Sequence, residues 1–116
     1  MGVQFIAINS NDADNYPEDN FENMKKRASA RKFNFLYLRD ESQVVAKAYE
    51  ATHTPHIFVF NEKLELAYTG KIDDNWQNPA LVNHQFLRDV LQALVQGKEP
   101  PVLETFAVGC TIKWKN

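Results

Sequence analysis

Apolar residues gather in runs that predict three strands. Gly2–Asn9 (GVQFIAIN) is apolar at nearly every position after Gln4, which is typical of a strand buried in a parallel sheet. Ile57–Phe60 (IFVF) is apolar throughout and predicts a second strand covered on both faces. Leu64–Gly70 alternates apolar and polar residues, as an antiparallel strand with one solvated face does, so a turn near residues 61–63 predicts a hairpin.

Helical spacing predicts two helices between the first two strands. Pro17 suits the first turn of a helix whose acidic residues come early and whose basic residues come late, an order that complements the helix dipole. Its inward side chains are expected to be Phe21, Met24 and Ala28. Asp40 is predicted to cap a second helix through about Tyr49, with Gln43 at the capping-box position. The intervening Phe33–Leu38 (FNFLYL) is a short apolar connector able to pair briefly as a strand.

A third helix is predicted to begin at Asn78–Pro79 and to end at Gly97. Its apolar positions keep helical spacing: Leu81, Val82, Phe86, Leu87, Val90, Leu91, Leu94 and Val95. The order strand, helix, helix, strand, strand, helix predicts an α/β fold, a three-layer sandwich with a mixed sheet. In that sheet the first two strands run parallel across a long crossover, and the hairpin adds an antiparallel strand.

Composition narrows the class of partner. The 116 residues suit a single domain, 1–116, with an irregular tail over 98–116. A formal net charge of −2 gives no reason to expect a nucleic acid or a membrane surface as partner. No apolar run approaches the ~20 residues of a membrane helix, and Met1 leads into strand-like sequence, so no signal peptide is expected. One cysteine, Cys110, excludes an internal disulfide framework and predicts a reducing, cytoplasmic location.

Pro55 stands directly before an apolar strand, in THTPHIFVF. Proline has no N–H to donate to a sheet, so it belongs at a strand's first residue, on an edge or at a bulge. The sequence therefore predicts a shaped loop at the mouth of the strand.

THTPHIFVF, the later YTG and the final amphipathic helix together resemble the C-terminal half of a thioredoxin fold. With GVQFIAINSNDADNYPEDNFENM, YLRDESQVVAKAY, YTGKIDDNW and GCTIKW, nearly the whole chain resembles peroxiredoxin-like members of the alkyl hydroperoxide reductase and thiol-specific antioxidant superfamily. The resemblance implies a cis peptide bond between Thr54 and Pro55. It also implies that this loop lies against a redox cysteine and offers backbone groups to an incoming thiol or peptide.

The chain departs from that family at its start. The family's N-terminal strand, cysteine-containing turn and helix have no counterpart, so the resemblance implies a truncated thioredoxin-like fold covering the C-terminal two-thirds. By the same analogy, the missing strand would lie between VQFIAI and IFVF. Two apolar strands would then each have an unpaired edge. These edges could close onto each other, or a second copy could pair with them; we predict a homodimer by strand swapping or edge pairing.

The candidate site comprises Thr54 and Pro55 as a substrate-binding loop, flanked by His53 and His56. The two histidines do not predict a metal site, because no Cys or His cluster completes four ligands, and no cofactor is expected. Two interpretations of Cys110 remain open. It is either the resolving thiol that the resemblance implies or an inert cysteine of the tail, and an intermolecular Cys110–Cys110 disulfide is also possible. Adjacent Asp73 and Asp74 predict a loop with Asx turns rather than paired catalytic carboxylates.

Two functions follow. The resemblance implies a thiol-dependent oxidoreductase whose partner is a protein thiol, a disulfide or a peroxide. With one cysteine, this chain is expected to be inactive by itself. The alternative is a catalytically dead remnant that serves as a structural or protein-interaction module.

Overall fold

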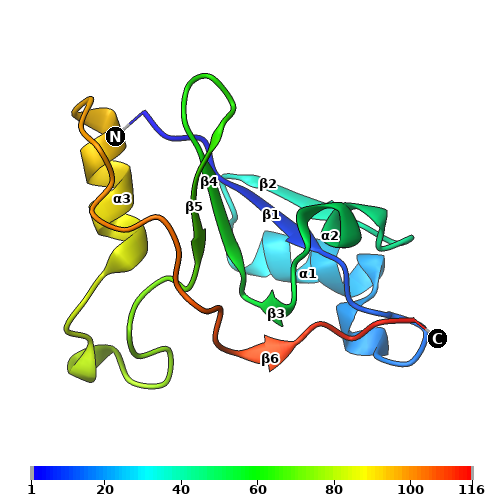
Figure 1. The fold of residues 1–116 in the computed structure, drawn as a ribbon. Helices are drawn as coiled ribbons and strands as arrows, with labels where there is room; N and C mark the ends of the chain where they lie inside the picture. The colour runs from blue at the N-terminus through cyan, green and yellow to red at the C-terminus, as the bar shows by residue number, and fades with distance from the viewer. Residues whose placement is uncertain (1, 116) are drawn as a thin grey trace. The chain divides into compact units, whose positions relative to one another are not determined.

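The computed structural model describes residues 2–115, which form two compact units. The N-terminal unit comprises Val3–Ala51 with residues 112–115, and the C-terminal unit comprises Gly2 and Thr52–Thr111. Each unit contains both helix and strand (Figure 1), which confirms the predicted α/β class. The described strands form one parallel and two antiparallel pairs in three separate two-stranded sheets, rather than the single mixed sheet that the sequence predicted.

The N-terminal unit is built on a parallel pair of strands. Its elements are β1 (Ile6–Asn9), the 3-10 turn η1 (Pro17–Asp19), α1 (Phe21–Ala30), β2 (Leu36–Arg39) and α2 (Val44–Tyr49). Strand β1 pairs with β2, so the apolar connector before Arg39 is a true strand and is the described partner of the first strand. Helix α1 lies along this pair (Figure 1), with the Arg27 guanidinium donating to the Tyr37 hydroxyl at 2.9 Å and Met24 only 2% exposed.

Two burial predictions in this unit are wrong. Strand β1 is not buried: Ile6 and Ile8 are 48% and 44% exposed, because among the described residues the strand pairs with β2 and α1 packs on the Tyr37 side of the pair. Phe21 does not face inward either and is 53% exposed. It is the first residue of α1, which begins where the Asn20 side-chain oxygen accepts a hydrogen bond from the Asn23 N–H at 2.8 Å.

Asp40 is not the N-cap residue of α2, which begins at Val44 after Gln43, but its buried carboxylate still accepts hydrogen bonds from the first turn of the helix. The Val45 and Ala46 N–H groups donate to it at 3.3 and 2.9 Å, and the Ser10 hydroxyl donates at 2.7 Å. Burial alone raises the pKa of Asp40, but these hydrogen bonds outweigh it and hold the pKa below its usual value.

Gln43 does not complete a capping box; it holds the end of the chain instead. It has a left-handed backbone, and its fully buried side chain turns away from the helix. The Nε2 group donates to the backbone oxygens of Ser10 and Lys113 at 2.8 and 2.9 Å, and Oε1 accepts from the Lys115 N–H at 3.0 Å. Gln43 therefore ties residues 113–115 to the loop that follows β1.

The C-terminal unit is built on the predicted hairpin. Its elements are β3 (His53–Thr54), β4 (Ile57–Phe60), β5 (Leu66–Gly70), the 3-10 turn η2 (Pro79–Leu81), α3 (Phe86–Val95) and β6 (Cys110–Thr111). Strands β4 and β5 pair antiparallel on either side of a turn at Asn61, whose side chain accepts the N–H groups of Lys63 and Glu65. Both faces of β4 were expected to be covered, but Phe60 is 41% exposed.

Helix α3 begins later than predicted. Asn78 caps only the short turn η2, and the helix itself starts at Phe86. It ends as predicted at Gly97, which has φ of +71°. The helix packs against the hairpin in a core of Val59, Tyr68 and Val90, joined by partly buried Ile57, Phe86, Leu87, Leu91, Leu94 and Val102. No helix within residues 2–115 has the length and apolar character needed to cross a bilayer.

Candidate functional site

Cys110 lies beside the proline loop. Strands β3 and β6 pair antiparallel, with Thr54 directly opposite Cys110 and His53 opposite Thr111 (Figure 1). The Thr54–Pro55 peptide bond is cis, which confirms the geometry that the resemblance implies. Cys110 is exposed, so its thiol is accessible to solvent at the edge of this loop. The structure thus brings together three predicted site residues from two distant parts of the sequence.

Gly109 allows the tail to approach the loop. Its φ is +142°, a conformation that side-chain-bearing residues rarely adopt. A Cβ at this position would lie 2.6 Å from the Thr54 carbonyl oxygen and 3.3 Å from Pro55 Cδ. Any larger residue would therefore push the chain away from Thr54, so Gly109 is what permits Cys110 to stand opposite the loop.

A second contact fixes the tail before it reaches the loop. The Thr69 N–H donates to the Leu103 oxygen at 3.2 Å, and the Thr105 N–H donates to the Thr69 oxygen at 3.0 Å. The Thr105 hydroxyl lies 2.7 Å from the hydroxyl of buried Tyr68 and accepts from the Lys71 N–H at 3.0 Å. Residues 103–105 are therefore hydrogen-bonded to β5, and the chain continues from there to β6, which pairs with β3.

His56 acts as a structural bridge within the loop. The Thr52 N–H donates to His56 Nδ1 at 3.1 Å, so the proton of the neutral ring lies on Nε2, which is 3.2 Å from the Thr69 hydroxyl. The ring also stacks on Phe58 with 4.5 Å between centroids. Burial, followed by the nearby charge of His53, lowers the pKa of His56 below its ordinary value. The structure therefore favours a neutral imidazole here.

His53 and His56 do not converge on a metal. Each has its Nδ1 atom near Thr52, at 2.8 Å from the hydroxyl for His53 and 3.1 Å from the backbone nitrogen for His56. Within residues 2–115, no group of three or more His, Cys, Asp or Glu side chains is placed to bind a metal ion. Asp73 accepts the Asn75 N–H at 3.0 Å in an Asx turn, while Asp74 accepts the Asn83 N–H and lies 3.3 Å from His84 Nδ1.

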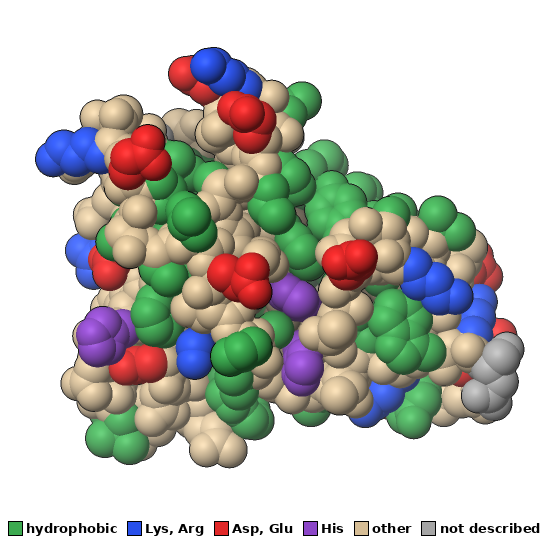
Figure 2. Space-filling model, viewed as in Figure 1, with side chains coloured by type: hydrophobic (Ala, Val, Ile, Leu, Met, Phe, Trp, Pro, Cys, Tyr) green, Lys and Arg blue, Asp and Glu red, His purple; other side chains and the backbone are tan. Residues whose placement is uncertain are grey.

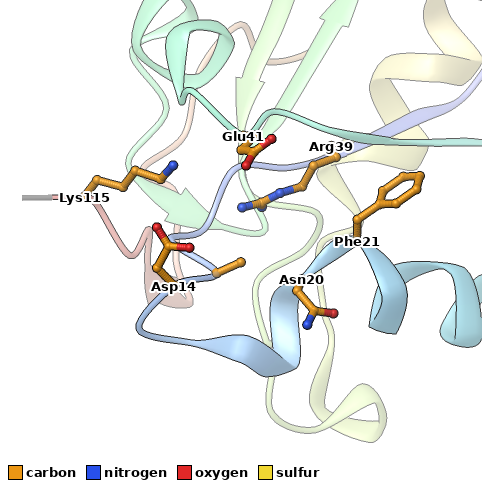
Figure 3. Close-up of a pocket in the computed structure, with 7 residues that line it drawn as sticks. Asp14, Asn20, Phe21, Arg39, Glu41 and Lys115 are labelled. Carbon is orange, nitrogen blue, oxygen red and sulfur yellow. The ribbon is translucent and has the colours of Figure 1, made fainter.

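A shallow hollow in the N-terminal unit is lined by charges of both signs. Figure 3 shows Arg39 projecting into this space of about 260 Å³, which Asp14, Asn20, Phe21, Glu41 and Lys115 also line. Two cationic and two carboxylate side chains give the hollow no preference for an anion or a cation. Neither the proline loop nor Cys110 belongs to it.

The pairing of β6 with β3 was not predicted from the sequence. The relevant signal was the glycine directly before Cys110, but it stands in a tail without regular periodicity. Only the three-dimensional fold shows that a segment more than fifty residues further along the chain returns to Thr54.

Two solved structures resemble this chain in both sequence and fold. No protein-family model matches the chain, and a search of curated proteins also finds no match. A crystal structure of an uncharacterized conserved protein from Geobacillus kaustophilus is 47% identical, with a TM-score of 0.90 over 98% of this chain and 61% of that one. A hypothetical protein from Sinorhizobium meliloti 1021 is 38% identical, also with a TM-score of 0.90, over 98% of this chain and 63% of its own.

The chain therefore spans about three fifths of the length of these solved structures. High identity and high structural similarity together show that the three proteins share the described fold. Both neighbours are described only as uncharacterized or hypothetical, so the likeness carries no activity with it.

Proposed function

We propose that this chain provides the resolving half of a thiol-dependent oxidoreductase, thioredoxin-like or peroxiredoxin-like in lineage. In this proposal Cys110 is the resolving thiol, and the Thr54–Pro55 loop orients the partner. The observation that supports it is the pairing of Thr54 with Cys110, which sets an exposed thiol beside the one loop that the family resemblance associates with thiol exchange.

The proposed reaction needs a second sulfur. A partner cysteine is first oxidised by a peroxide to a sulfenic acid, or is already joined in a disulfide. The Cys110 thiolate attacks the partner sulfur, forming a new S–S bond. Either the S–O bond breaks and the oxygen leaves as water after taking up a proton, or the old S–S bond breaks and the departing thiolate takes up the proton. An external thiol then reduces the mixed disulfide and restores Cys110.

The partner must supply that second sulfur because the chain contains one cysteine. By itself the chain is expected to form mixed disulfides but not to sustain turnover. Its substrate class is therefore a protein or peptide disulfide or sulfenic acid, and a reducing compartment such as the cytoplasm suits a free exposed thiol.

The same cysteine count favours a second candidate function. A scaffold with the loop but only one thiol also suits an inactive protein-interaction module, and several large apolar side chains of the N-terminal unit are exposed. In that case Cys110 has no special reactivity.

The rate of thiol–disulfide exchange at Cys110 separates the two functions. A peptide disulfide with a chromophoric leaving thiol is mixed with the folded chain, and then with the same chain unfolded in urea. The redox proposal predicts exchange about tenfold faster in the folded chain, a gain of about 1.4 kcal/mol from orientation by the loop. Cys110→Ser serves as the blank. An equal or slower rate in the folded chain would support the interaction module instead.

A turnover assay provides the second readout. Insulin reduction and peroxide consumption by the 116-residue chain are expected to equal those of Cys110→Ser. Substantial turnover by the wild-type chain would defeat the inactive-module alternative and would also contradict the requirement for a second sulfur from a partner.

A further inference from the structure

The hollow that Arg39 enters lies beyond the carboxyl ends of β1 and β2. These strands are parallel, so both end at the same edge of their sheet, at Asn9 and Arg39. The lining residues follow those ends: Ala13 and Asp14 come after β1, Asn20 and Phe21 stand where α1 begins, and Glu41 comes after β2. In open α/β sheets, ligands bind in the crevice outside the carboxyl ends of the strands. The hollow is therefore where this class of fold places a ligand.

Four charged side chains converge on this hollow. Figure 3 shows the charged ends of Asp14, Arg39, Glu41 and Lys115 turned toward one space. Within residues 2–115, none of these four side chains takes part in an ion pair. Figure 2 shows acidic and basic side chains interspersed at the surface of this part of the N-terminal unit. Two cations and two carboxylates are thus available to a ligand that itself carries both charges.

Both cations stand on backbone that the fold holds in place. Nη1 of Arg39 donates to the Asn9 carbonyl oxygen at 3.2 Å, which orients the guanidinium and leaves its other N–H groups free to receive a carboxylate. The Lys115 N–H donates at 3.0 Å to the side chain of Gln43, which is only 1% exposed. A ligand therefore meets cations that are already positioned, which lowers the ordering cost of binding.

We propose that this hollow binds a small zwitterion, an α-amino acid. Arg39 and Lys115 receive its carboxylate, and Asp14 and Glu41 receive its ammonium group. The volume of about 260 Å³ lies below the ~300–1,000 Å³ of sites for drug-sized ligands, so it suits a molecule of this size. The ring of Phe21, which is 53% exposed, offers an apolar contact to the ligand's side chain. This inference does not depend on Cys110 or on the proposed redox function.

An NMR titration of the nitrogen-15-labelled chain with L-phenylalanine tests the proposal. We expect a dissociation constant of about 1–10 mM for so small a ligand, with shifts at the backbone amides of Asn20, Phe21 and Glu41. Arg39→Gln removes the oriented cation and should weaken binding at least about tenfold. Arg31→Gln, which changes an exposed arginine at the opposite end of α1, is the matched control and should bind like the wild type.

The dispersion of each spectrum establishes that the variant is folded. If Arg39→Gln unfolds, the double variant Asp14→Asn/Glu41→Gln replaces it, since both positions are exposed, and it should weaken binding at least about fivefold.

Ligand analogues separate the two charges. N-acetyl-L-phenylalanine lacks the ammonium group and L-phenylalaninamide lacks the carboxylate, so each should bind at least about tenfold more weakly than L-phenylalanine. Equal binding of either analogue, or of inorganic phosphate, would mean a site for a single charge and would overturn the proposal. The absence of shifts with L-phenylalanine, or unchanged binding in a folded variant of the hollow, overturns it equally.

Discussion

Thr54 and Gly109 are so close that the loop carbonyl occupies the space of a missing side chain. The Thr54 oxygen lies 2.6 Å from the point where a Cβ on Gly109 would stand. This contact links two parts of the C-terminal unit that are remote in sequence, and the next residue after it is Cys110. The conformation of one glycine therefore determines whether the thiol can lie beside the proline loop.

Gly109→Ala tests that dependence. Its φ of +142° and the blocked space both oppose a side chain, so we expect a loss of about 2–3 kcal/mol in the free energy of unfolding. Gly97→Ala is the matched control, because Gly97 also has positive φ (+71°) but has nothing within 4 Å of its would-be Cβ. It should cost only about 1 kcal/mol. Urea denaturation measures the free energy of unfolding of both variants. Equal losses in the two would mean that Gly109 does not lie in close contact with Thr54.

Gln43 gives a second prediction, on the attachment of the C-terminal residues. Gln43→Ala leaves the Ser10 and Lys113 carbonyls and the Lys115 N–H without their side-chain partner. We expect a loss of about 2–4 kcal/mol from these buried groups and faster hydrogen exchange at the Lys115 amide.

The exposed Gln92 in α3 provides the control for that change. Gln92→Ala should alter the free energy of unfolding by less than about 0.5 kcal/mol. Unchanged exchange at Lys115 in Gln43→Ala would show that Gln43 does not hold this part of the chain.

The free energy of unfolding should depend on pH through the protonation of His56. Its folded pKa is lowered, so between pH 5 and the ordinary value of 6.5 the unfolded chain binds more protons than the folded chain. The contribution of His56 is therefore fully present above pH 6.5 and is lost as the pH falls through its folded pKa. Urea unfolding measured at intervals from pH 8 to pH 5 should show the free energy of unfolding decreasing below pH 6.5.

His56→Gln isolates this contribution, because glutamine keeps a hydrogen-bonding side chain but does not titrate in this range. The variant should be less stable than the wild type at pH 8 and should show a flatter profile below pH 6.5. A profile with the same slope as the wild type would assign the effect to other groups.

Tyr68 connects the hydrophobic core to the tail. Its ring is fully buried, and its hydroxyl donates to the Lys71 oxygen and lies 2.7 Å from the Thr105 hydroxyl. Tyr68→Phe keeps the ring but removes both contacts, so we expect a loss of about 1–2 kcal/mol by urea denaturation. Hydrogen exchange at the Thr105 amide should also quicken, and protection equal to the wild type would contradict the role assigned to this hydroxyl.

The sequence predicted those elements whose signal is local. The hairpin followed from alternation after an apolar run, the existence of α1 from the order of its charges, and the end of α3 from Gly97, because each depends on neighbours within a few residues. The start of α1 was placed too early, since Pro17 belongs to the separate turn η1 and the helix begins at Phe21. The start of α3 was placed too early because Asn78 and Pro79 carry a start signal that the structure uses for a separate turn, η2.

Burial and long-range pairing were harder to predict. The apolar character of Ile6 and Ile8 indicated a covered strand, but coverage depends on which other segments reach it. The sequence identified Thr54, Pro55 and Cys110 separately, yet nothing local to any of them encodes the β3–β6 register. The close approach of Gly109 to Thr54 accompanies that register, and only the folded chain displays it.

A disulfide trap measures the relationship between Cys110 and Thr54 directly. Facing residues of an antiparallel pair have Cβ atoms about 4.5–5.5 Å apart, near enough for a disulfide after a small adjustment. Thr54→Cys is oxidised under mild conditions at low protein concentration and examined by intact-mass spectrometry. Glu62→Cys, in the exposed turn at the opposite end of the β4–β5 hairpin, is the control. We predict that Thr54→Cys loses two hydrogen masses as a monomer while Glu62→Cys does not, and failure of Thr54→Cys to close a bridge with Cys110 would contradict the site on which the proposed function rests.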